Sequence, residues 1–170
     1  MQKREIVLDT ETTGLDPKTD RIIEIGCVEL LDGIPTGREY HQYINPQRSV
    51  NRLAARSVHG ISDATLADKP VFAQVADAFL AFIGDTPLVI HNAQFDLGML
   101  NAELRGCGRP LLDRSRAICT LTMAREKRPG CPASLDALCS HYKVCSDRNL
   151  HGALTDAKIL AEVYIHLTGG

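Results

Sequence analysis

The stretch RIIEIGCVELLDG, residues 21–33, decides how the first part of the chain folds. Apolar and β-branched residues fill most of it, and it ends on Asp32-Gly33, a dipeptide typical of tight turns. A short apolar run at residues 5–9 precedes it, and an alternating segment at residues 39–44 follows it. Short connections between such runs favour antiparallel pairing. We therefore expect three adjacent, largely antiparallel strands.

After residue 70 the apolar spacing changes from that of strands to that of helices. Apolar residues recur at helical intervals over residues 71–82, and Gly84 ends this segment. Residues 88–90 then predict a short buried strand, and residues 93–105 predict a helix. A strand that is reached through a helix takes a parallel neighbour. The sequence thus predicts a mixed sheet.

The last part of the chain predicts two more helices, at residues 134–142 and 153–167. With 170 residues, 44% of them hydrophobic and 24% charged, the chain has the balance of one globular domain. We expect residues 1–170 to form a single α/β domain. No apolar run is long enough to span a bilayer, no secretory signal is visible, and the six cysteines are scattered. We therefore expect a soluble, cytoplasmic protein with reduced thiols and no membrane partner.

Two acidic residues lie on the apolar faces of predicted helices. Asp156 falls at helical spacing with Leu160 and Val163, and Asp96 does so with Leu100. A buried carboxylate must be paired, protonated or bound to a cation. Attraction of an acid to a helix N-terminus is the other interpretation, and for Asp156 taken alone both stay open.

A third acidic feature follows the first predicted strand. Asp9 and Glu11 are two positions apart, so an extended backbone would project both carboxylates to one side of the sheet. The alternative is an acidic pair in the turn that follows the strand. Four acids from three separate segments suit a site for hard cations, and a pair of such cations is a known arrangement for phosphodiester cleavage.

His151 is the candidate general base. It precedes Asp156 by five residues, and a histidine titrates near neutral pH. The alternative is an ordinary polar residue in the loop that enters a helix. The net charge of −2 provides no global attraction for a nucleic acid, so any such substrate must be held locally.

Three motifs resemble those of the DEDDh 3′→5′ exonucleases: DTETTG at 9–14, HNAQFD at 91–96 and HGALTD at 151–156. Two further segments, VHGIS at 58–62 and SLDAL at 134–138, look like the proofreading epsilon subunits of bacterial DNA polymerase III, a branch of that family. The resemblance extends over nearly the whole chain. It implies a ribonuclease H-like α/β fold, with a mixed five-stranded sheet flanked by helices.

The resemblance also implies an activity and its residues. The activity would be release of 5′-mononucleotides from a 3′ end with two divalent cations, Mg²⁺ or Mn²⁺. By motif, the metal ligands would be Asp9, Glu11, Asp96 and Asp156, with His151 as the base.

The same motifs suggest which residues contact the substrate. Besides the metal ligands Asp9, Glu11 and Asp156, they are Thr12, Thr13, Gly14, Ala54, His59 and Phe95. Simpler interpretations stay open for several of them. Phe95 would serve equally as a core aromatic, His59 as part of a turn, and residues 12–14 as a loop. His91 and Asn92 are expected to cap the turn between strand and helix.

The expected substrate is a DNA 3′ end, single-stranded or at a frayed primer terminus. By resemblance the partner is a replicative polymerase catalytic subunit, although the chain stops where the nuclease domain of such subunits ends, so the usual attachment tail is expected to be absent. One alternative is an RNA-directed 3′ exoribonuclease. Another is a non-catalytic polymerase-associated subunit, which the intact set of acids and histidine argues against.

Overall fold

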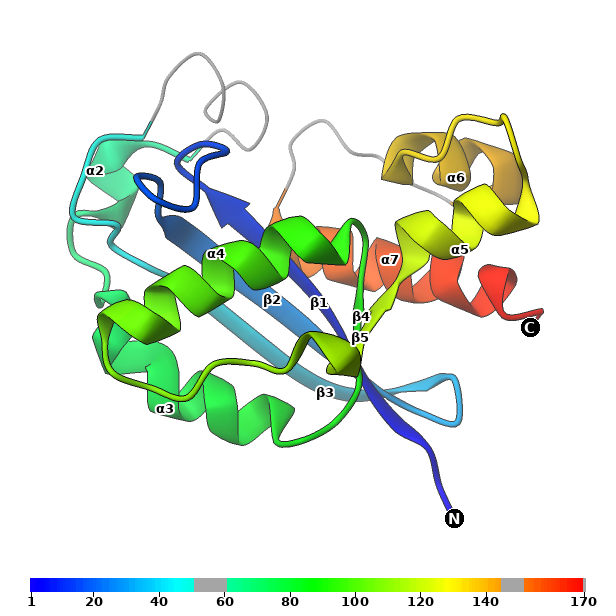
Figure 1. Cartoon of the computed structure of the whole chain (residues 1–170), viewed down its shortest axis with the longest axis horizontal. Helices are drawn as coiled ribbons and strands as arrows, with labels where there is room; N and C mark the ends of the chain where they lie inside the picture. Colours follow the sequence, from blue (N-terminus) through cyan, green and yellow to red (C-terminus); the bar gives the residue numbers. More distant parts are fainter. Residues whose placement is uncertain (51–60, 145–151, 170) are drawn as a thin grey trace.

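The computed structural model describes residues 1–50, 61–144 and 152–169, which build a five-stranded mixed sheet with helices on both faces (Figure 1). The strand order is β3-β2-β1-β4-β5. β1 (Arg4–Thr12) pairs antiparallel with β2 (Ile22–Leu31), and β2 pairs antiparallel with β3 (Ile34–Tyr43). The three strands predicted from the first part of the sequence are therefore confirmed as neighbours.

The other half of the sheet is parallel. β4 (Leu88–Ile90) pairs with β1, and β5 (Ala117–Cys119) pairs with β4. The chain passes from β3 to β4 through α2 (Asp63–Leu66) and α3 (Phe72–Ile83), which allows the parallel pairing. The mixed sheet and the ribonuclease H-like fold class are thus as predicted.

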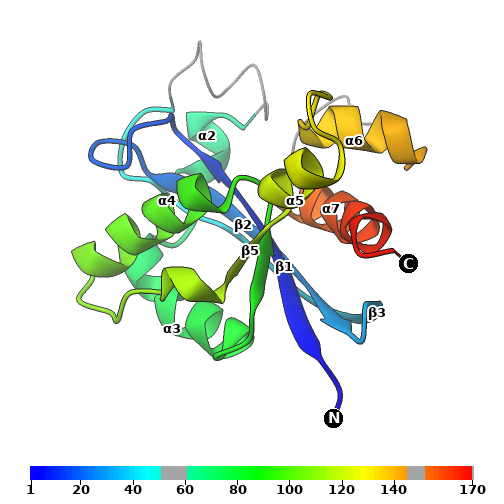
Figure 2. The same ribbon diagram turned by 45° about the vertical axis from the view of Figure 1, so that its right-hand side comes forward.

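Strand β1 separates two packed layers because its side chains alternate between the faces of the sheet. Ile6 belongs to the apolar cluster that includes α3 and α4 (Ala93–Gly106). Val7 belongs to a second cluster, with α7 (Ala153–Leu167). Figures 1 and 2 show α3 and α4 on one side of the sheet and α7 on the other. The apolar side chains of β1 thus pack alternately into the two layers.

Helix α7 starts in close contact with β2. Gly26 faces its first turn so tightly that an added Cβ would lie 2.3 Å from the backbone nitrogen of Leu154. Beside it, the Ala153 backbone N–H donates to Oε1 of Glu24 at 2.9 Å. These two contacts place the beginning of α7 beside the last residues of β1.

The remaining helical elements follow α4 in the chain. α5 (Thr120–Lys127) and α6 (Leu135–Tyr142) pack with α7 in a further apolar cluster, and a 3₁₀ turn, η1 (Arg114–Arg116), leads into β5. Within the described residues, no helix has the length and hydropathy that crossing a bilayer requires.

Two elements differ from the sequence-based expectation. β3 begins at Ile34 rather than at residue 39, because the turn at Asp32 and Gly33, both with positive φ, pairs Ile34 directly with Leu31. The exposed first half of this edge strand lacks the alternation by which strands are recognised. Strand β5 and helix α5 were not predicted, and for β5 the reason is that Ala117–Cys119 lacks the run of bulky apolar residues by which Leu88–Ile90 is recognised. That residues 1–170 form one domain stays a prediction.

We expect Gly26→Ala to destabilise the protein by roughly 1–3 kcal/mol, the usual range for forcing atoms into a filled space. The new methyl group would push the first turn of α7 away from β2, because the atoms it meets are backbone. Urea unfolding followed by circular dichroism measures the change. Gly106→Ala, where an added Cβ has no neighbour within 4 Å, is the control and should leave the midpoint nearly unchanged. Equal midpoints for both variants would contradict this account of the α7 contact.

Candidate active site

Three carboxylates meet where β1 ends and α7 begins. Asp9, Glu11 and Asp156 each offer an oxygen, and these oxygens lie within 4.8 Å of one another. Asp9 and Glu11 alternate with Thr10 along β1, so both point toward the α7 side of the sheet, as predicted for extended backbone. Asp156 comes from the first turn of α7 and is only 5% exposed.

Asp96 reaches the same end of β1 from the opposite face. It lies in the first turn of α4, where Asn92, in the left-handed conformation with φ 63°, turns the chain from β4 into the helix. The Thr10 hydroxyl donates to Oδ1 of Asp96 at 2.5 Å, and Asp96 is 4% exposed. Asp96 lines one cavity of about 290 Å³ with Asp9 and Asp156, although it is outside the 4.8 Å group.

The site is electrostatically unfavourable in the absence of a cation. Burial, followed by the charges of Asp96, Glu11 and Asp156, raises the pKa of Asp9 well above its ordinary value. Burial also raises the pKa of Asp96 to about 7, against the opposing effect of its hydrogen bond from Thr10. Although Asp9 as a residue is partly exposed, its Oδ2 is buried and has no hydrogen-bond partner in the described part of the chain. A divalent cation would supply the charge and the ligand that this oxygen lacks, so these residues fit a metal site.

The predicted substrate residues after β1 form a tight loop. The Thr13 hydroxyl donates to Asp20 at 2.8 Å and accepts from the Arg21 backbone N–H at 3.0 Å. Gly14 is pressed against Asp20, because an added Cβ would lie 2.5 Å from its carboxylate. The Thr12 hydroxyl donates to the Gly14 carbonyl. Substrate contacts by residues 12–14 stay predictions.

Phe95 and three positions outside the described residues complete the predicted set. Phe95 is half-buried, packs against the α3–α4 cluster and lines the cavity, so it is both a core aromatic and a cavity residue. His151, Ala54 and His59 lie outside the described residues. Their roles therefore rest on the motifs.

Sequence reasoning assigned His91 only a capping role, whereas its side chain lines the cavity and Asn92 is the N-cap of α4. Nδ1 of His91 is 2.9 Å from the Thr120 hydroxyl, which itself donates to the Ile90 carbonyl. Burial and the nearby charge of Arg125 lower the pKa of His91, against the opposing effect of a hydrogen bond to the Ala133 backbone, so the neutral ring is favoured.

The first residues of α6 were also missed. Ser134, Leu135 and Asp136, at the start of α6, line the cavity. The sequence predicts a helix over this segment and SLDAL carries the resemblance, but its spacing does not indicate a place in the site. Glu24, which holds Ala153, acts through a contact across the sheet that local sequence does not reveal.

A family model described as "Exonuclease" (RNase_T) matches residues 6–164. The chain belongs to this exonuclease family. Curated relatives include the DNA polymerase III subunit epsilon of Rickettsia felis, 55% identical over 98% of this chain and 75% of that protein. The subunit of the same name from Salmonella typhimurium is 48% identical, over 98% of this chain and 72% of that protein.

Solved exonucleases share the fold. Exonuclease X, in complex with 5′ overhanging duplex DNA, is 30% identical with a TM-score of 0.76, over 96% of this chain and 90% of that chain. Escherichia coli Exonuclease I, in complex with a dT13 oligonucleotide, has a TM-score of 0.84 at 15% identity, over 98% of this chain and 41% of that one. Membership of the exonuclease family and the high identity to epsilon subunits show that the protein is a metal-dependent 3′→5′ exonuclease of the proofreading type.

The raised pKa values predict how stability depends on pH without metal. Because the folded state holds a proton on Asp96 up to about pH 7 and the unfolded chain only to about 3.8, unfolding releases protons between these values. Stability should therefore fall between about pH 4 and pH 7, by roughly 1.4 kcal/mol per unit of pKa difference. In chelator, thermal unfolding should show a lower midpoint at pH 8 than at pH 5.

Asp96→Asn should flatten this pH dependence, since the amide still accepts the Thr10 hydrogen bond but carries no charge. Glu126→Gln, on an exposed position of α5, is the matched control and should keep the wild-type slope. The interpretation fails if Asp96→Asn keeps the wild-type slope as well.

Proposed function

We propose that Asp9, Glu11, Asp96 and Asp156 hold two divalent cations, Mg²⁺ or Mn²⁺, and that His151 is the general base of hydrolysis at a DNA 3′ end. The convergence of Asp9, Glu11 and Asp156 within 4.8 Å is the observation that carries the proposal. Membership of the exonuclease family supports it.

When bound, the cations would lower the pKa of a water molecule and stabilise negative charge on the leaving oxygen. Held by the four carboxylates, the cations would also attract the phosphate at the end of the substrate. Asp96 accepts a hydrogen bond from Thr10 and Asp156 lies in the first turn of α7, so the fold itself positions both carboxylates. Pre-positioned ligands reduce the reorganisation needed during reaction.

The hydrolysis itself combines a proton transfer with the exchange of one phosphorus–oxygen bond for another. His151 accepts a proton from water as the water oxygen bonds to phosphorus. The bond from phosphorus to the 3′ oxygen of the preceding nucleotide breaks, and that oxygen takes a proton from solvent. The products are a 5′-mononucleotide and a strand that is one nucleotide shorter, with a free 3′ hydroxyl. Residues 12–14, Phe95, Ala54 and His59 would shape the pocket for the terminal nucleotide.

The names of the relatives favour DNA over RNA as the substrate. The curated relatives are DNA polymerase subunits, and Exonuclease X and Exonuclease I were solved with DNA. The substrate would be a single-stranded end or a frayed primer terminus. The partner would be the catalytic subunit of a replicative polymerase, and the protein would act in the cytoplasm. The intact acid set argues against a non-catalytic subunit.

We expect the protein with Mg²⁺ or Mn²⁺ to release mononucleotides from a 3′-mismatched DNA primer, and chelator or Asp9→Ala to abolish the release. Chelator removes the cations, and Asp9→Ala removes a carboxylate that would hold them. Gel analysis of a 5′-labelled primer measures the reaction, with Glu126→Gln as the control. Activity that survives Asp9→Ala, or that prefers an RNA oligomer of the same sequence, would overturn the proposal.

His151→Ala should slow turnover by roughly 10²-fold or more while leaving metal binding intact, because a general base contributes on that scale. Single-turnover cleavage measures the first effect, and calorimetric titration with Mn²⁺ measures the second. His141→Ala, on an exposed position of α6, is the control. Wild-type turnover in His151→Ala would remove this residue from the mechanism.

A further inference from the structure

A second cavity, of about 780 Å³, lies beside α4. The loop after β1 borders it with Pro17 and Lys18, and the segment after α4 borders it with residues that include Arg114. All three charged residues of its lining are basic, namely Lys18, Arg105 and Arg114. We call this cavity the basic groove.

One face of α4 connects the basic groove to the active-site cavity. Phe95 lines the active-site cavity, whereas Gly98, Ala102 and Arg105 line the groove. These positions are spaced by three, four and three residues, so they form a single stripe along the helix. Because Gly98 and Ala102 are small, the stripe is hollow between Phe95 and Arg105. A strand leaving the active site along α4 would therefore enter the groove directly.

Helix stability does not explain Gly98. A glycine inside a helix costs roughly 0.5–1 kcal/mol relative to alanine. An added Cβ at Gly98 would lie 3.9 Å from Cγ of Pro17, an ordinary contact distance, so the fold itself would accept alanine here. A small residue is instead what a groove for an extended ligand needs.

The basic side chains of the groove remain exposed to solvent. Lys18, Arg105 and Arg114 are exposed and form no ion pair within residues 1–50, 61–144 and 152–169. Nearby arginines differ, since Arg21 pairs with Glu103 and Arg109 pairs with Asp77. Three unpaired cations around one cavity in a chain of net charge −2 indicate an anionic ligand.

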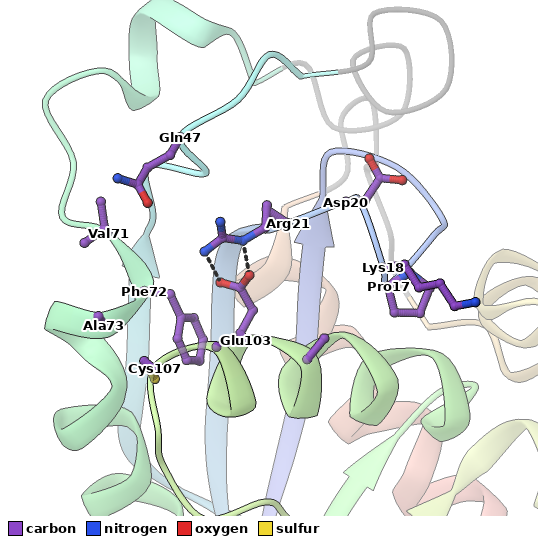
Figure 3. Close-up of a pocket in the computed structure, with 12 residues that line it drawn as sticks. Pro17, Lys18, Asp20, Arg21, Gln47, Val71, Phe72, Ala73, Glu103 and Cys107 are labelled. Carbon is purple, nitrogen blue, oxygen red and sulfur yellow. Dashed lines mark hydrogen bonds and ion pairs between the residues drawn. The ribbon is translucent and has the colours of Figure 1, made fainter.

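The loop that carries Lys18 is anchored to α4. Figure 3 shows Glu103 extending from α4 to Arg21, with Pro17 and Lys18 above the same helix. Nη2 of Arg21 is 3.4 Å from Oε2 of Glu103, and Glu103 is 6% exposed. The loop thus runs from β1 to a half-buried ion pair with α4, and Lys18, which lies between them in the chain, lines the groove.

We propose that the basic groove binds the phosphate backbone of the substrate strand outside the active site. Arg105 lies nine residues beyond Asp96, about 13 Å along the helix at 1.5 Å per residue. At about 3.4 Å per nucleotide, that is a reach of roughly four nucleotides. The contacts would be independent of base sequence, as degradation of any 3′ end requires. This inference rests on the proposed nucleic-acid substrate.

The test compares two double variants that remove one lysine and one arginine each. Lys18→Gln with Arg105→Gln neutralises the groove, and Arg128→Gln with Lys143→Gln is the control away from it. Binding of a 5′-fluorescein dT12 oligomer is measured by anisotropy in chelator at several salt concentrations. Each lost phosphate contact lowers the salt slope by about 0.7, so the groove variant should lose about 1.4 and the control nothing.

Kinetics give the second readout. With Mg²⁺, the ratio of KM for dT12 to KM for a thymidine dinucleotide should rise about tenfold or more in the groove variant, because only dT12 reaches the groove. The control should keep the wild-type ratio.

The outcomes separate this inference from the proposed function. If wild type cleaves both substrates but the groove variant matches the control in slope and ratio, the groove proposal is overturned and the exonuclease stands. An acidic protein surface would then be the better ligand for the groove. If wild type cleaves neither substrate, the proposed function fails. The salt slope from anisotropy still shows whether the groove binds the phosphate backbone. Absence of dT12 binding by wild type in chelator would also overturn the groove proposal.

Discussion

Repulsion between buried carboxylates at the end of β1 is the constraint on which the rest of the structure depends. Asp9 lies among Glu11, Asp96 and Asp156, and its pKa is raised by burial and by their charges. Such a group of acids does not stabilise a fold. It persists because the surrounding packing holds the backbone in place and because cations compensate the charge when they bind. The fold therefore carries a local cost in order to keep a metal site ready.

The packing that holds these acids together depends on β1, whose side chains alternate between the two faces of the sheet. Odd-numbered residues of β1 near its end face α7, and even-numbered ones face α4, so one strand reaches a helix on each side. Thr10 holds Asp96 from one layer, while the contact of α7 with Gly26 positions Asp156 in the other. Two helices that lie on opposite faces of the sheet thereby contribute acids to one cavity. A helix moved by even one turn would break the arrangement, which explains why the start of α7 is packed against backbone.

The sequence predicts those features whose signals lie within a few neighbouring residues. Asp96 and Asp156 were found because an acid on an apolar helical stripe is visible within a few residues, and both are buried as expected. The start of β3 was missed because its exposed half has no alternation, and β5 was missed because Ala117–Cys119 lacks the run of bulky apolar residues that predicts β4. Glu24, Ser134 and the cavity position of His91 depend on contacts between distant segments, and no spacing within the chain encodes those. The motifs identify the family, but only the fold shows which other residues line the cavity around the acids.

The separation of opposite charges along α4 explains how a chain of net charge −2 can act on a polyanion. Arg105 is exposed and about 13 Å along the helix from Asp96, which is too far for an ion pair, so Arg105 does not supply the positive charge that the acids lack. If Arg105 lay within one turn of Asp96, the two would form an ion pair and both functions would be lost. The length of α4 is thus itself functional: it keeps the groups that attract phosphate away from the groups that bind the cations.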